Sequence, residues 1–188
     1  MSTPAPLTTD PDLARALVDD LDAGFAALVR RHQGLLFGVA LRTTGARADA
    51  EDLAAEALLR AYRALRTYDA DRIRALEVRS WLVTILLNVR RNDARAAARR
   101  PTMSDGALTD RPAPGRTVEE QAEADPDLAG ALATLPEVQR SAVVLRHVAD
   151  LPVAEVAAAL RCPEGTVKSH VSRGLARLRA ALSERSTP

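Results

Sequence analysis

Polar and basic side chains gather near the start of the last predicted helix, residues 163–182. The outer and flanking positions there are Thr166, Lys168, Ser169, Ser172 and Arg173. Hydroxyl groups can donate hydrogen bonds to phosphate oxygens, and lysine or arginine neutralises phosphate charge or reaches guanine edges. This set is suited to binding double-stranded DNA. A terminal amphipathic helix with a solvated basic face would carry similar residues, so this helix alone leaves both interpretations open.

The residues before this set predict a helix-turn-helix. A short apolar segment, Val153–Leu160, is followed by Arg161 and Cys162, and Pro163 then stands where the first position of a helix is expected. The next helix has an apolar stripe formed by Val167, Val171, Leu175, Leu178 and Leu182. In this motif the second helix offers its outer face to the major groove. Glycine is common at the turn position of Arg161, and a left-handed backbone would cost this arginine about 1 kcal/mol.

A second basic set lies in residues 90–100, which hold five arginines and a single acid, Asp93. A cationic groove of this kind holds single-stranded nucleic acid when pockets or rings are available for unstacked bases. Trp81 precedes this set, in phase with Leu82, Ile85 and Val89. That phase favours a place for Trp81 in the core, which makes the loop between Tyr68 and Arg79 the better candidate for capturing a base.

An acidic set lies in residues 49–56, which hold four acids and no base. Three of these acids fall on one helical face with an arginine, at intervals of three, four and four residues: Asp49, Asp52, Glu56 and Arg60. Such a mixed stripe is ordinarily a solvated face with internal pairs, here Glu56 with Arg60. Taken alone, the stripe therefore predicts no partner.

The sequence offers no set of residues for catalysis. Cys162, His147 and His170 are too few and too scattered for a zinc site, and no glycine-rich phosphate loop is present. Glu51 and Asp52 have no evident partner that would make them acid–base catalysts. We therefore predict a protein that is not an enzyme and needs neither a metal nor a cofactor.

Helical periodicity fills most of the chain and predicts an all-α fold of two small domains. The predicted helices are one or two over residues 11–45, then Ala46–Leu65, Arg79–Ala98, Leu128–Thr134, Pro136–His147, Val153–Leu160 and Pro163–Leu182, with a turn at Tyr68–Arg74. Residues 101–126 hold four prolines and two glycines, which indicates a flexible linker with a short helix near Val118–Ala124. The predicted organisation is a tail (1–10), a helical domain (11–100), the linker (101–126) and a helix-turn-helix domain (127–185).

Composition agrees with this fold. The chain has 188 residues, of which 47% are apolar and only 3% aromatic, with a net charge of +1. Alanine, leucine and valine must therefore build the core, which favours helices. A single cysteine excludes an internal disulfide, and neither a signal peptide nor a run of 18–20 apolar residues is evident. We expect a soluble, cytoplasmic protein without membrane insertion.

Several short motifs resemble the bacterial sigma-70 family of RNA polymerase sigma factors. The motifs similar to region 4 are Leu132–Pro136, Arg140, Val144–Arg146, Ala154–Ala157 and Gly165–Ser169. Those similar to region 2 are Asp49–Leu53, Glu56, Leu59–Tyr62, Ser80–Leu82 and Asn88. Their order and spacing match over about residues 22–184. The short chain, with only a linker between the two domains, is similar to the extracytoplasmic-function (ECF) group.

This resemblance implies a role for each set. The helix with Asp49, Asp52, Glu56 and Arg60 would dock on the β′ coiled coil of core RNA polymerase, whose β flap would hold the other domain. The helix with Trp81, Asn88, Arg91 and Arg95 would hold the melted −10 element of promoter DNA. The last helix, with Thr166, Lys168, Ser169, Ser172 and Arg173, would read the −35 duplex, in part through DNA shape. Members of this group are often restrained by an anti-sigma factor, which is thus a candidate partner.

Two other functions remain open at this point. A stand-alone helix-turn-helix regulator would need a dimerisation or sensor domain in residues 46–100 and would bind paired half-sites. An enzyme or scaffold with a coincidental helix-turn-helix would show turnover or assembly instead. We further expect the free protein to bind DNA poorly, because the linker would leave the two domains unordered relative to each other.

Overall fold

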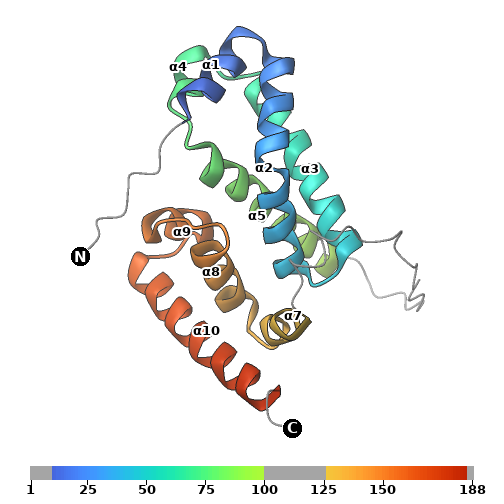
Figure 1. Cartoon of the computed structure of the whole chain (residues 1–188), viewed down its shortest axis with the longest axis vertical. Helices are drawn as coiled ribbons and strands as arrows, with labels where there is room; N and C mark the ends of the chain where they lie inside the picture. Colours follow the sequence, from blue (N-terminus) through green and yellow to red (C-terminus); the bar gives the residue numbers. More distant parts are fainter. Residues whose placement is uncertain (1–9, 100–125, 186–188) are drawn as a thin grey trace.

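The computed structural model describes residues 10–99 and 126–185, and all regular structure in these two stretches is α-helical. The helices, labelled in Figure 1, are α1 (Pro11–Asp19), α2 (Leu21–Thr44), α3 (Arg47–Leu65), α4 (Ala70–Arg74), α5 (Val78–Arg99), α7 (Pro126–Ala133), α8 (Glu137–His147), α9 (Val153–Leu160) and α10 (Glu164–Arg185). Among these residues no helix combines the length and the apolar character that crossing a membrane requires.

Aspartates begin several of the helices. The side chains of Asp10, Asp20 and Asp69 accept hydrogen bonds from backbone N–H groups in the first turns of α1, α2 and α4. These bonds satisfy donors that a helix start leaves without an intrahelical partner. Helix α2 ends as predicted at Thr43, Thr44 and Gly45, because Gly45 takes a left-handed backbone with φ of 84°.

The helices α1–α5 form one unit around the alanine-rich face of α3. Ala50, Ala57 and Ala61 are completely buried there, between α2 and α5. Small side chains let helix axes approach closely, which compensates for the scarcity of aromatic rings in the core. A hydrogen bond of 2.6 Å from the Tyr62 hydroxyl to Asp22 also ties α3 to the start of α2.

The helices α7–α10 form the second unit, in which α10 packs across α7, α8 and α9. Gly174 lets α10 lie close against α8, because a Cβ at this position would be only 2.6 Å from Cγ2 of Val143. The side chain of Arg177 donates a hydrogen bond of 3.2 Å to Oε1 of the buried Gln139 and holds the same two helices together. The packing of the inner face of α10 against α8 thus fixes the direction in which its outer face points.

The two units are in contact, with α8 against α2 and α9 against α5 (Figure 1). This differs from the expectation of two domains without a fixed relation. Buried apolar residues of both units belong to one cluster, and a row of polar contacts also joins the units. The sequence pattern of either unit reveals neither. The predicted linker and its short helix near Val118–Ala124 lie outside the described residues, apart from Pro126 at the start of α7.

Two local predictions were wrong. The predicted turn at Tyr68–Arg74 contains the short helix α4, which Asp69 caps. Pro163 precedes α10 instead of occupying its first position, and its carbonyl accepts the hydrogen bonds from the backbone of Thr166 and Val167. The first difference adds a short helix and the second moves a boundary, and the predicted helix-turn-helix is unchanged.

Candidate polymerase and DNA interfaces

The acidic stripe of α3 lies on one face, as its spacing predicts. Asp49 and Asp52 are exposed, and Glu56 and Arg60 form an ion pair of 2.6 Å with side chains 38% and 39% exposed. Residues of α3 and α5, with the last residue of α2, line a groove beside this stripe: Thr44, Asp49, Asp52, Leu53, Glu56, Arg90 and Asp93. The face is accessible and negatively charged along most of its length, which is the arrangement that a basic partner surface requires.

The predicted strand-binding residues are spread along α5. Asn88 and Arg91 are half-buried and one helical turn apart, and Arg95 lies in the same helix, although its side chain is outside the described part of the structure. Arg90, which the motif comparison passed over, is only 20% exposed and pairs with Glu137. Asn88 and Arg91 are therefore neighbours on α5, and Trp81 lies seven residues before Asn88, near the start of the same helix.

Trp81 lies near the start of α5 beside Tyr68, with ring centroids 6.1 Å apart. Both rings are half-buried, so Trp81 is neither fully in the core nor fully presented to a ligand. The guanidinium of Arg72 in α4 lies 3.8 Å from the centroid of the Tyr68 ring. A cation stacked on an aromatic ring is a common contact in binding sites for unstacked bases. The sequence singled out this loop but not Arg72.

The helix-turn-helix consists of α9 and α10. Lys168, Ser169, Ser172 and Arg173 are exposed on α10, and Thr166 is half-buried near its start. Lys168 and Ser172 also line a groove, together with the apolar residues Val153, Val171 and Leu175. The predicted set is therefore presented together along the first three turns of α10.

The turn of this motif has the predicted strained backbone. Arg161 has φ of 57° and ψ of 45°, the left-handed conformation in which glycine is favoured. Its amide donates hydrogen bonds to the carbonyls of Ala157 and Ala158, which ends α9 at Leu160. The chain then passes through Cys162 and Pro163 into α10.

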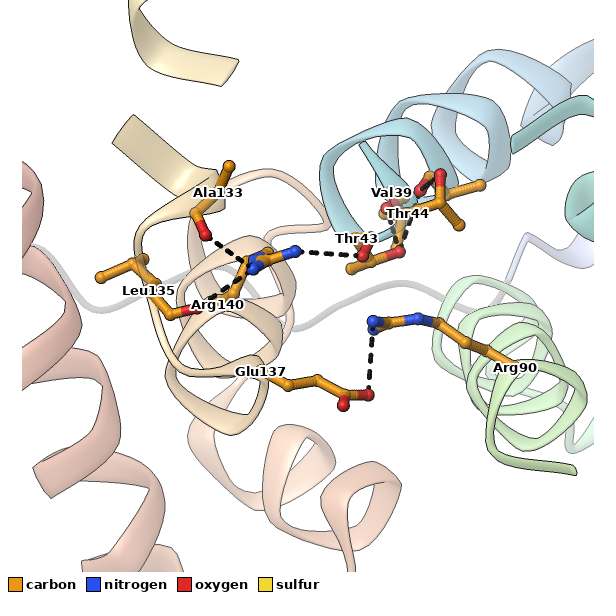
Figure 2. Close-up of polar contacts among 9 residues, drawn as sticks. Val39, Thr43, Thr44, Arg90, Ala133, Leu135, Glu137 and Arg140 are labelled. Carbon is orange, nitrogen blue, oxygen red and sulfur yellow. Dashed lines mark hydrogen bonds and ion pairs between the residues drawn. The ribbon is translucent and has the colours of Figure 1, made fainter. Parts of the chain in front are cut away.

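Arginines and their partners form a polar seam where the two units meet, as Figure 2 shows for Arg90 and Arg140. Nη2 of Arg90 in α5 lies 3.3 Å from a carboxylate oxygen of Glu137 in α8. Nη1 of Arg140 donates to the carbonyl of Thr43 at 3.5 Å, while its Nη2 holds the carbonyls of Ala133 and Leu135 within its own unit. Burial lowers the pKa of Arg90, Glu137 opposes that change, and the nearby charge of Arg140 adds to it.

Further contacts continue the seam toward α9. Nη1 of Arg79 donates to the carbonyl of Ala149 at 3.4 Å, and Nη2 of Arg161 donates to Oδ1 of Asn88 at 3.5 Å. Burial raises the pKa of the Glu155 carboxyl, although its hydrogen bond with Ser80 of α5 works in the opposite direction. The seam therefore includes Asn88, one of the residues predicted to bind the −10 strand.

Comparison with known families assigns both units. The model described as Sigma-70 region 2 matches residues 28–100, and the model described as Sigma-70, region 4 matches residues 127–178. The matched domains are those of a transcription initiation factor that binds DNA. The region 2 match occupies the residues in which a stand-alone regulator would need a dimerisation or sensor domain.

Relatives of similar length show to which group of this family the chain belongs. The chain is 31% identical over 183 residues to the RNA polymerase sigma-H factor of Pseudomonas aeruginosa, covering 89% of this chain and 91% of the relative. It is 34% identical over 180 residues to the ECF RNA polymerase sigma factor SigM of Mycobacterium tuberculosis, covering 95% and 87%. The protein belongs to the ECF group of the sigma-70 family of RNA polymerase sigma factors.

Solved structures agree with the all-α fold of two domains. CnrH in complex with the cytosolic domain of CnrY is 25% identical with a TM-score of 0.66, and covers 95% of this chain and all of that chain. The sigma factor RpoE in complex with the anti-sigma factor NepR from Bartonella quintana is 25% identical with a TM-score of 0.63, covering 88% and 98%.

Proposed function

We propose that the acidic face of α3 binds core RNA polymerase, that α5 holds the separated −10 strand and that α10 reads the −35 duplex. The observation that carries this proposal is the presence of an accessible acidic face and an exposed basic helix-turn-helix in one chain, within units that match regions 2 and 4. Neither surface alone would distinguish a sigma factor from other helical DNA-binding proteins.

The α3 face supports the polymerase contact by its charge and accessibility. Asp49 and Asp52 are exposed, and the Glu56–Arg60 ion pair lies beside them on the same face. Exposed charges of one sign steer a partner of the opposite sign and fix its orientation. The basic surface that this face would meet lies on the coiled coil of the β′ subunit.

The proposed contacts with single-stranded DNA and those with duplex DNA lie on different helices. Arg72 of α4 lies over the ring of Tyr68, which lies beside the ring of Trp81, and α5 carries further arginines. This combination suits a strand with unstacked bases. On α10, Lys168 and Arg173 flank the small side chains of Ser169 and Ser172, which suits close approach to a duplex. The protein thereby directs polymerase to a promoter and takes part in opening the DNA.

A reciprocal experiment tests the assignment. The double variant Asp52→Arg/Glu56→Arg should bind purified core polymerase at least roughly tenfold more weakly in a titration, since attraction is replaced by repulsion at the contact. The matched variant Lys168→Ala/Arg173→Ala should bind core polymerase like the wild type but transcribe poorly from a cognate promoter. Unchanged polymerase affinity in the first variant would contradict the α3 site, and unchanged transcription in the second would contradict the α10 site.

The remaining assignments follow from this function. A sigma factor acts where RNA polymerase acts, so the proposal places the protein in the cytoplasm. An anti-sigma factor is also a candidate partner, since the relative from Bartonella quintana was solved with one. Residues 11–100 and 127–185 would be the two working domains, with residues 101–126 as the linker.

A further inference from the structure

We propose that Gln139 of α8 is a positioning residue for the −35 contact. Through its hydrogen bond with Arg177 it sets the rotation of α10 about its own axis, and with it the promoter selectivity of that helix. The inference rests on the proposed role of α10 and adds a residue that acts on DNA recognition from inside the protein. It also gives Arg177 a partner within the chain, although a basic residue on this helix would ordinarily be assigned to a phosphate of the DNA.

The first argument is that the inner face of α10 has no side chain at its middle turn. Among the described side chains of α10, the buried positions are Val167, Gly174 and Leu178, which lie on one helical face. Val167 and Leu178 fill the core at the two ends of this stretch, but Gly174 has nothing to interlock with α8. Apolar packing has no preferred direction, so contacts at the two ends alone determine the rotation of the helix less strictly.

The second argument is that Gln139 contacts α10 at this middle turn and again one turn further along. A Cβ placed on Gly174 would lie 3.4 Å from the carbonyl oxygen of Gln139 and 3.6 Å from its Cβ. The side-chain Oε1 of Gln139 accepts the hydrogen bond of 3.2 Å from Nη1 of Arg177. Gln139 is only 8% exposed, so little water competes for its amide. Because a hydrogen bond depends on direction, this one fixes the rotation that the apolar packing leaves less determined.

The third argument is the short path from this bond to the residues proposed to read DNA. Ser172 and Arg173 directly precede Gly174, and Lys168 and Ser169 lie about one turn earlier on the exposed face. A helix with its side chains is about 10–12 Å across, so a rotation of about 10° moves side-chain tips by about 1 Å. Binding residues must be held to within about 0.5 Å to be effective. Losing the bond should therefore impair base discrimination more than the attraction to phosphates, which carries no sequence information.

The promoter selectivity of the holoenzyme measures this role. It is the ratio of initial transcription rates from a cognate promoter and from the same promoter with one −35 base pair changed. Gln139→Leu removes the acceptor and keeps a side chain of similar size, and it should lower the selectivity roughly three- to tenfold. Gln139→Glu keeps an acceptor for Arg177 and should stay within about twofold of the wild type. Wild-type selectivity in Gln139→Leu, or the same loss in Gln139→Glu, would overturn the inference.

Arg177→Met tests the other end of the bond, and Arg179→Met is its matched control. Both variants remove one exposed arginine of α10, so both should fold and both change the net charge equally. Arg177→Met should lose selectivity by the same factor as Gln139→Leu, whereas Arg179→Met should keep the wild-type ratio. The double variant Gln139→Leu/Arg177→Met should lose no more than either single variant, because both residues act through one bond. Equal losses in the two arginine variants, or losses that multiply in the double variant, would overturn the inference.

The salt dependence of promoter binding separates positioning from a direct phosphate contact. If Arg177 bound a phosphate, Arg177→Met would reduce the slope of log affinity against log salt concentration by about one. We expect the holoenzyme with Arg177→Met to keep the wild-type slope while its selectivity falls. A reduced slope in this variant would show that Arg177 meets the DNA itself, and would overturn the positioning role.

The Lys168→Ala/Arg173→Ala chain separates this inference from the proposed function. Unchanged promoter use in that chain would refute the role of α10 in reading the −35 duplex, and the inference with it. Impaired promoter use in that chain, together with wild-type selectivity in Gln139→Leu and Arg177→Met, would refute the inference and leave the proposed function intact.

Discussion

Two glycines in α2 provide a matched test of how closely its neighbours pack. Both become alanine in the same helix, but a Cβ at Gly24 would lie 2.5 Å from the backbone nitrogen of Leu17 and 2.6 Å from two further backbone atoms of α1. A Cβ at Gly34 would meet nothing within 4 Å. We therefore expect Gly24→Ala to destabilise the protein and Gly34→Ala to stabilise it.

The magnitudes follow from two opposing effects. Alanine is favoured over glycine inside a helix by about 1 kcal/mol, and this gain applies at both positions. At Gly24 the backbone of α1 must move, and forcing extra atoms into a packed contact costs about 1–3 kcal/mol. Detaching α1 instead would expose Leu13 and Leu17 at a cost of about 1.5–3 kcal/mol each, so it gives no easier escape. Because the clash at Gly24 is with backbone atoms, the upper end of that cost applies. The expected net changes are a loss of about 2 kcal/mol at Gly24 and a gain of about 1 kcal/mol at Gly34.

Urea unfolding followed by far-UV circular dichroism measures both changes. The predicted difference of about 3 kcal/mol between the variants exceeds the usual error of extrapolation to water. Gly34→Ala is the control, because it carries the same helix-propensity gain without the clash. If Gly24→Ala were as stable as the wild type, α1 would not pack against α2 as described, and its support of the neighbouring α4 would also be in doubt.

Two further predictions concern strain and protonation. Arg161→Gly should raise the free energy of unfolding by about 1 kcal/mol in urea titrations, because glycine has no left-handed penalty; an unchanged or lower value would mean that the turn is unstrained. Burial, reinforced by the charges of Arg31 and Arg79, lowers the pKa of His32 below its ordinary value of 6.5, while Asp10 opposes this. The unfolded chain then takes up a proton that the folded chain resists, so His32 favours folding above pH 6.5 and this contribution declines as the pH falls. The loss of stability between about pH 7.5 and 5.5 should be smaller in His32→Gln, and an equal loss in both chains would contradict the assignment.

The sequence predicted most of the helices because their ends carry strong local signals. The bounds Val153–Leu160 were confirmed, since Pro152 precedes the helix and the left-handed Arg161 ends it. Gly45 ended α2 for the same kind of reason. Helix α4 was missed because a segment of five residues is too short to show a helical period.

The seam between the two units could not be predicted in the same way. Arg90 and Glu137 are far apart in the chain, and each belongs to a pattern with its own local explanation, a cationic DNA-binding set or the first turn of a helix. Helical periodicity describes residues close in the sequence, so it cannot predict that a charge in one unit pairs with a charge in the other. The roles of Asp52, Asn88 and Lys168 stay predictions for a related reason, because accessibility alone does not reveal what a side chain binds.

The pairing of Trp81 with Tyr68 has a consequence for spectroscopy. All five aromatic rings of the Phe, Tyr and Trp type lie between residues 25 and 81, and residues 127–185 have none. Intrinsic fluorescence therefore originates wholly from the N-terminal unit, beside the loop proposed to receive a base. Quenching of the Trp81 fluorescence on adding single-stranded DNA would indicate binding at that loop. Duplex binding at α10 would leave the fluorescence unchanged unless the two units also moved apart. The wild-type chain thus carries an intrinsic fluorescent probe in its N-terminal unit only. Its fluorescence can distinguish strand binding from duplex binding without an added dye.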